Sequence, residues 1–233
     1  MAKEKKVYLN FPITLIPPIY KGKDVVKAID DIIMYGIVAY CVGKNKGYED
    51  ALEEMGITSK LSYEEQKKAY DKAPKTSVFT SIEKGKAFAF RDAQKSYKDN
   101  KDEIMALCGE LAVRSIVGVK DYAKCFRGLV LSRMAGFAKG VQEDWYPDAV
   151  KKLAGDGGKR QWRKLIASLR YAGCSIYTPK GCHGFYASFR LSPVELAEKV
   201  ERKKREADRR KTEYDLSNEE LRKMALERIG RTP

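Results

Sequence analysis

Three residues whose side chains could bind a metal ion or move a proton lie close together in the sequence: Cys174, Cys182 and His183. Thiolate and imidazole groups are usual zinc ligands, but structural zinc sites place paired ligands roughly two to five residues apart. Here the spacing is C-x7-C-H, and adjacent cysteine and histidine ligands are geometrically awkward. We therefore predict no metal and no cofactor, while a metal at these three residues stays open.

His183 is the only histidine of the chain, so it is the first candidate for a general base. A general base must lie within hydrogen-bond reach of a nucleophile or substrate proton, and no nucleophile stands at a spacing that suggests such a pair. The acids and lysines cluster on charged helix faces. The sequence therefore predicts no catalytic residue and no enzyme, and it favours His183 as a residue that faces phosphate.

Basic residues are unusually concentrated in one part of the chain. The net charge is +14 over 233 residues, and residues 151–192 contain nine basic residues against the single acid Asp156. A local excess of this kind on a helix and a hairpin indicates a polyanionic partner. The alternative is a surface that only keeps the protein in solution, but the charge coincides with the motif described next.

Residues 159–171 are predicted to form a helix with one apolar and one basic face. The apolar residues are spaced i, i+3, i+4, i+7, which is typical of an α-helix packed on a core: Trp162, Leu165, Ile166 and Leu169. The opposite face, called here the basic face, consists of Arg160, Arg163, Lys164, Ala167 and Tyr171. Gly173 then supplies a left-handed cap that ends the helix.

A β-hairpin is predicted immediately after this helix. Residues 176–178 form a short strand, residues 179–184 contain the Pro and Gly typical of a turn, and residues 185–191 alternate between apolar and polar side chains. A basic amphipathic helix followed at once by a hairpin is the expected form of the last helix and wing of a winged helix-turn-helix.

The motif Leu169-Arg170-x-x-Gly173-x-x-Ile176, followed by Gly181-x-x-Gly184-Phe185-Tyr186, carries a resemblance. It resembles the L-R-x-x-G-x-x-I and G-x-G-Y motifs in winged-helix domains of bacterial and phage regulators and replication proteins. This chain has two residues between the wing glycines, where the common form has one. The resemblance covers residues 99–192 and implies double-stranded DNA as the partner.

The predicted DNA-binding residues fall in three groups. Arginine can bind guanine and glutamine can bind adenine in the major groove, whereas contacts to phosphate supply affinity without sequence information. The helix contributes Arg160, Gln161, Arg163, Lys164 and Arg170, and the hairpin contributes Tyr177, Lys180, His183 and Arg190. Backbone contacts are expected from Lys124, Arg127 and Arg133.

The fold class predicted from these patterns is mainly α, with a winged helix-turn-helix and a small hairpin wing. We predict an N-terminal helical module (residues 1–98), a winged-helix domain (99–192) and a charged helical extension (193–233). Within the first module, residues 7–20 are expected to be extended, and residues 77–94 to form two helices around a turn. Residues 24–42, 99–118 and 126–136 carry helical periodicity. In the extension, one helix is expected to end near Tyr214 and a second to cover residues 219–229.

The predicted function is non-catalytic binding of double-stranded DNA in replication initiation or transcriptional regulation of a phage or mobile element. Two alternatives stay open: a protein-interaction component that uses the winged helix as a packing module, and an RNA-binding protein. Residues 1–98 could serve self-association or bind a protein partner. The odd number of five cysteines indicates reduced thiols and a cytoplasmic location, and the absence of a long apolar run predicts no membrane span.

Overall fold

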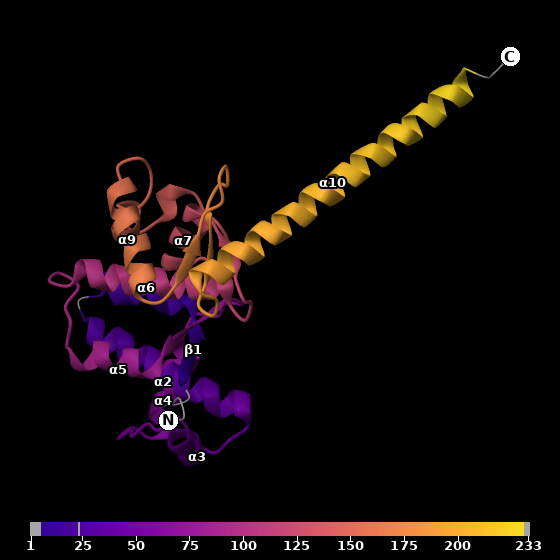
Figure 1. Ribbon diagram of the computed structural model, residues 1–233. Helices are drawn as coiled ribbons and strands as arrows, with labels where there is room; N and C mark the ends of the chain where they lie inside the picture. Colours follow the sequence, from indigo (N-terminus) through magenta and orange to yellow (C-terminus); the bar gives the residue numbers. More distant parts are fainter. Residues whose placement is uncertain (1–5, 23, 231–233) are drawn as a thin grey trace.

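The computed structural model describes residues 6–22 and 24–230, except for the side chains of residues 213, 216 and 226–229. Residues 1–5, 23 and 231–233, which belong to the predicted terminal modules, lie outside the described residues. The described chain is mainly helical, which confirms the predicted class (Figure 1). Its first half contains β1 (Tyr8–Pro12), η1 (Ile13–Leu15), α1 (Ile16–Lys21), α2 (Val25–Lys44), α3 (Tyr48–Met55), α4 (Tyr63–Lys72), β2 (Phe79–Glu83) and α5 (Lys84–Asp92). Its second half contains α6 (Lys101–Val117), β3 (Ala123–Cys125), α7 (Arg127–Met134), η2 (Glu143–Trp145), α8 (Asp148–Lys151), α9 (Lys159–Tyr171), β4 (Ser175–Tyr177), β5 (Phe185–Ser188) and α10 (Pro193–Ile229).

Helix α2 is the centre of the first half. Asp24 caps it by accepting a hydrogen bond from the Lys27 amide at 2.9 Å, and Asn45 ends it in a left-handed conformation. The helix packs on β1, α4 and α5. Gly36 lets β1 approach closely, since a Cβ there would lie 2.7 Å from the Cβ of Leu9.

The prediction of two helices for residues 77–94 is wrong in its first part, because residues 79–83 form β2. This strand pairs antiparallel with β1, with Leu9 opposite Ile82 and Phe11 opposite Thr80. Thr80 is buried and its hydroxyl donates to the Leu111 carbonyl at 2.6 Å.

The prediction that residues 7–20 are extended holds only for β1, since Pro17 and Pro18 lie in the first turn of α1, where proline is tolerated.

Helix α6 packs against both halves of the chain. It lies on α1 and β2 on one side and on α7, α9 and β3 on the other. Gly109 allows α9 to come close, since a Cβ there would lie 2.5 Å from Cδ1 of Leu165. A single cluster of buried apolar side chains therefore extends from Leu9 to Ala187. The predicted boundary between residues 98 and 99 falls just before this shared helix.

The second sheet has three antiparallel strands in the order β3-β5-β4. Its first strand, β3, lies in the connection between α6 and α7. Lys124, Tyr186 and Tyr177 stand opposite one another across the strands, so they share one face of the sheet. The other face carries Phe185 and Ala187, both buried in the core.

The long connection between α7 and α9 is packed against the body. The Tyr146 ring is buried, and its hydroxyl lies 3.1 Å from Ser132 Oγ and donates to the Gly128 carbonyl at 3.1 Å. Val150 of α8 is also fully buried. The buried Tyr146 and Val150 therefore fix this short helical segment on the body.

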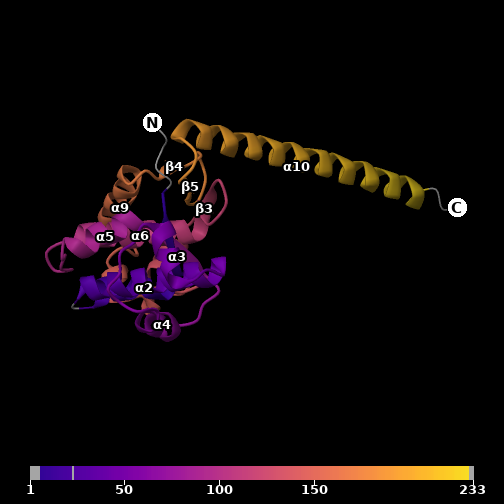
Figure 2. The ribbon, with the colours of Figure 1, turned by 90° about the horizontal axis from the view of Figure 1, so that it is seen from below.

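Helix α10 begins at a capping box formed by Ser192 and Glu195. The Ser192 amide donates to Glu195 Oε2 at 2.8 Å, and the Glu195 amide donates to Ser192 Oγ at 3.3 Å. Leu196 and Val200 are buried, whereas the rest of the helix projects away from the body (Figures 1 and 2). The predicted break near Tyr214 is wrong, since the helix continues to Ile229.

In the described part of the chain, no helix combines the length and apolarity required to cross a membrane.

Candidate nucleic-acid interface

The basic face of α9 is exposed, as its periodicity predicts. Leu165 and Leu169 are buried, while the five residues of the basic face are exposed: Arg160, Arg163, Lys164, Ala167 and Tyr171. Trp162 is half-buried, with its ring centroid 6.3 Å from that of Phe185. The helix therefore presents its cations to solvent because its apolar stripe is fixed against α6 and the hairpin.

The end of α9 places the hairpin directly beside the helix. Gly173 takes a φ of 84°, and the Cys174 amide donates to the Leu169 carbonyl at 3.0 Å. Such a left-handed cap ends a helix within one residue and turns the chain sharply. Strand β4 then starts at Ser175, so the hairpin and the helix lie side by side.

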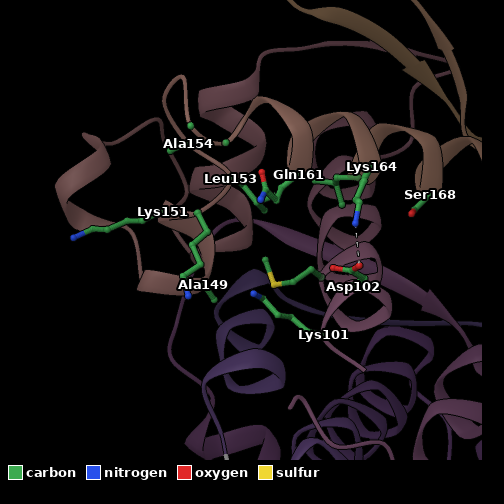
Figure 3. A pocket seen from close by; sticks show the side chains of 14 residues that line it. Lys101, Asp102, Ala149, Lys151, Leu153, Ala154, Gln161, Lys164 and Ser168 are labelled. Carbon is green, nitrogen blue, oxygen red and sulfur yellow. Dashed lines mark ion pairs between the residues drawn. The ribbon is translucent and has the colours of Figure 1, made fainter. Parts of the chain in front are cut away.

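Gln161 and Lys164 lie on one flank of α9, over a hollow between α6 and α8. Lys164 points toward α6, where its Nζ lies 3.6 Å from Asp102 Oδ2 (Figure 3). Both side chains of this pair are largely exposed, and exposed pairs contribute only about 0–1 kcal/mol, so this contact holds Lys164 only weakly. Three further lysines line this hollow: Lys101, Lys151 and Lys152. Lys151 and Lys152 belong to the basic segment 151–192 but were not predicted to bind, and Lys101 was missed because it is distant in the chain.

Arg163 and Arg170 lie on the other flank, over a cleft between α9 and the hairpin. Arg127 of α7 lines the same cleft. However, its Nε donates to the Leu153 carbonyl at 3.0 Å, its Nη2 donates to the same oxygen, and its guanidinium lies 5.6 Å from the Trp162 ring centroid. These donors hold the α8–α9 connection in place, and the DNA-backbone contact of Arg127 stays a prediction.

Arg133 is half-buried. Its Nε and Nη1 atoms are buried and have no hydrogen-bond partner among the described residues. Burial disfavours the charged form and lowers the pKa of this guanidinium. The backbone contact of Arg133 stays a prediction, and the burial of two of its nitrogens disfavours it.

Tyr177 and Arg190 also have partners within the protein. The Tyr177 hydroxyl donates to Glu201 Oε1 on α10 at 2.7 Å. Arg190 Nη1 donates to the Val119 carbonyl at 2.8 Å and lies 4.0 Å from Asp121 Oδ1. These contacts attach the hairpin to α10 and to the loop before β3, while Arg190 stays exposed and Tyr177 half-buried. DNA contacts by these two side chains stay predictions.

The tip of the hairpin remains open to solvent. Lys180 and His183 are exposed there, and Lys124 is exposed on the neighbouring strand β3. Gly181 and Gly184 take φ angles of 73° and 91°, which side chains with a Cβ rarely adopt. The turn therefore presents a lysine and an imidazole beside the basic face of α9.

Among the described residues, no group of three His, Cys, Asp or Glu side chains is arranged to hold a metal ion. Cys174 is buried, and burial raises the pKa of its thiol to about 12. Cys182 is half-buried and its thiol lies 3.5 Å from the His183 carbonyl. The three residues considered as metal ligands therefore differ in exposure, since Cys174 is buried and His183 is exposed.

The chain matches no protein-family model, no curated protein and no solved structure in three separate comparisons. Its function must therefore be inferred from the geometry and charge of the described side chains.

Proposed function

We propose that the protein binds double-stranded DNA through a winged helix-turn-helix formed by residues 99–192. In this proposal α6 and α7 are the first two helices, α9 is the recognition helix, and β4 and β5 form the wing. The order α6, β3, α7, α9 and hairpin, with a β3-β5-β4 sheet, supports it, although η2 and α8 are inserted between α7 and α9. The observation that carries it is the exposed basic face of α9 beside an exposed hairpin tip.

In the proposed complex, α9 enters the major groove. Arg160, Arg163 and Gln161 are exposed and are the candidates to contact base edges, with Lys164 and Arg170 on either flank. Lys180, His183 and Lys124 would contact phosphates from the hairpin and sheet.

The charge of this surface favours a duplex partner over an acidic protein. A regularly charged phosphate backbone requires cations spread over a broad face, and here cations lie on α9, at the hairpin tip and around the α6–α8 hollow. The wider role is proposed from the resemblance alone: replication initiation or transcriptional regulation of a phage or mobile element.

The test is a fluorescence-anisotropy titration with blunt duplex DNA, using a variant that combines Arg160→Ala and Arg163→Ala. Each base-contacting arginine should contribute about 1–3 kcal/mol, so losing both should weaken binding by at least about 25-fold. Neither residue forms an ion pair with a described residue, and both are exposed, so folding should be unaffected.

The matched control removes two charges far from α9, by Arg222→Ala and Lys223→Ala on the exposed distal part of α10. It should bind duplex within about twofold of the wild type, because it keeps the whole proposed surface. Equal affinities of the α9 variant and the control would exclude α9 as the recognition helix.

A further inference from the structure

A second basic surface lies between the hairpin and α10, on the face of the three-stranded sheet that carries Lys124 and Tyr186. Two adjoining hollows there share Tyr122, Lys203 and Ala207 in their linings. The first is bounded by Lys124 of β3, Lys180 at the hairpin tip, Tyr186 of β5 and Lys204 of α10. The second continues along α10 past Arg202 to Arg210. We call these two hollows the sheet–α10 cleft.

The walls of the cleft are held in fixed positions. Leu196 and Val200 of α10 are buried against the body. The Tyr177 hydroxyl bonds Glu201 at 2.7 Å, and Lys199 Nζ lies 2.9 Å from Asp121 Oδ2. The first two turns of α10 are therefore fastened to β4 and to the loop before β3, and Figure 2 shows the helix starting beside β4 and β5.

The cleft carries a large uncompensated positive charge. Six cations line it without an ion pair to any described residue: Lys124, Lys180, Arg202, Lys203, Lys204 and Arg210. All six are exposed, and Glu206 is the only acid in the described lining. Placing like charges along one cleft is unfavourable in the free protein, so the arrangement indicates a polyanion there.

Two half-exposed tyrosine rings accompany these cations. The ring centroids of Tyr122 and Tyr186 lie 6.0 Å apart in an edge-to-face arrangement. Lysine side chains beside exposed aromatic rings are the combination with which proteins hold unpaired nucleotides, because the cations follow the phosphates while the bases stack on the rings.

The part of the cleft beside the hairpin tip is small. The hollow beside the hairpin tip has a volume of about 380 Å³, which suits a ligand of nucleotide size. Bases inside a duplex cover each other's faces, so only an unpaired base can stack on Tyr122 or Tyr186.

We propose that the sheet–α10 cleft binds a single-stranded polynucleotide, with phosphates on Lys203, Lys204 and Lys180 and an unpaired base on Tyr122 or Tyr186. This site is distinct from the proposed duplex surface on α9. Lys124 and Lys180 are common to both surfaces, whereas Lys203 and Lys204 belong to the cleft alone.

The test compares oligo(dT) and oligo(U) of about twenty nucleotides with blunt duplex DNA, using full-length protein. The variant Lys203→Ala with Lys204→Ala should bind the single strands about 20-fold more weakly at 0.1 M salt, because losing two phosphate contacts lowers the salt slope by about 1.4. Its duplex affinity should stay within about twofold. The control, Arg222→Ala with Lys223→Ala, removes the same charge from the same helix about 28 Å further along and should bind like the wild type.

A second readout locates the strand directly. Oligonucleotides that carry 5-iodouracil should form photo-crosslinks to Tyr122 or Tyr186, and mass spectrometry identifies the linked residue. Crosslinks confined to α9, or equal losses in the cleft variant and its control, would overturn the proposal. Displacement of the oligonucleotide by poly-glutamate at the same charge concentration would also overturn it, because the cleft would then select only for negative charge.

The two proposals fail in different ways. If the duplex proposal alone is wrong, blunt duplex does not bind while oligo(dT) still binds and depends on Lys203 and Lys204. If the cleft proposal alone is wrong, duplex binding depends on Arg160 and Arg163, and no single-strand binding responds to Lys203 and Lys204. Tighter binding of oligo(dT) or of oligo(U), with the same dependence on the cleft lysines, supports the proposal and shows which of the two strands is preferred.

Discussion

Individual side chains of the basic region differ in what could be inferred from the sequence. The exposure of Arg160 and Arg163 follows from helical periodicity, because an apolar stripe fixed on the core sets the opposite face. The partners of Arg127 and Tyr177 do not follow, since each bonds a residue more than twenty positions away, at Leu153 and Glu201. Long-range contacts of this kind leave no local signal in the sequence.

At the same scale, the thiols should differ sharply in reactivity. Burial raises the pKa of Cys125 and of Cys174 to about 12, and it also raises the pKa of Cys41 and Cys108. Since the thiolate is the reactive form, these four buried thiols should be unreactive at pH 8, whereas the half-buried Cys182 should react. Titration with an aromatic disulfide reagent should show one fast thiol in the native protein and five in urea. Two or more fast thiols in the native protein would contradict the described packing.

Among the elements, the helices were predicted well and the strands less well. Helices α2, α6 and α9 show helical periodicity in their own residues, and α2 also has a side-chain N-cap at Asp24. Strand β2 was missed because its identity depends on pairing with β1, some seventy residues earlier. The predicted break in α10 failed because Ser217 resembles an N-cap, while no Gly or Pro between residues 208 and 229 stops the helix.

The hairpin offers a test at the scale of elements. A Cβ at Gly184 would collide with the Cys125 carbonyl oxygen on the neighbouring strand, and the backbone there has a φ of 91°. Gly181 also has a positive φ, at 73°, but a Cβ there meets nothing within 4 Å. Gly181→Ala should therefore cost only the strain of a left-handed residue, about 1–2 kcal/mol.

Gly184→Ala should lower the free energy of unfolding by more than Gly181→Ala, because β3 and β5 must also separate. Urea denaturation followed by circular dichroism measures both variants. Equal losses would mean that the close approach of Gly184 to β3 does not stabilise the sheet.

The whole molecule is organised around α6, which both halves share. Buried Glu110 of this helix forms ion pairs with Lys86 of α5 and with Arg114, the latter at 3.0 Å. The sequence shows that α6 has apolar residues, but it does not show that α1 and β2 cover one side and α9 the other. The packing of α6 between the two halves of the chain therefore could not be predicted from periodicity alone.

The projecting part of α10 should contribute little to the stability of this body. Its large apolar side chains Tyr214, Leu221 and Met224 are all more than half exposed, at 68%, 60% and 57%. A chain that stops after Lys211 keeps the buried Leu196 and Val200 and the whole sheet–α10 cleft. Its melting temperature should lie within about 2 °C of the wild type, because surface changes usually alter stability by less than about 0.5 kcal/mol. A fall of ten degrees would show that the distal helix packs on the body.

The most direct test of the central claim is the salt dependence of binding to blunt, random-sequence duplex DNA, measured by anisotropy between 50 and 200 mM salt. The exposed cations of α9, the hairpin tip and β3 should make about four to six phosphate contacts, so the logarithm of the affinity should fall against the logarithm of the salt concentration with a slope of about −4 to −5. A slope near zero, or no binding at 50 mM salt, would contradict a duplex-binding role for α9 and the hairpin.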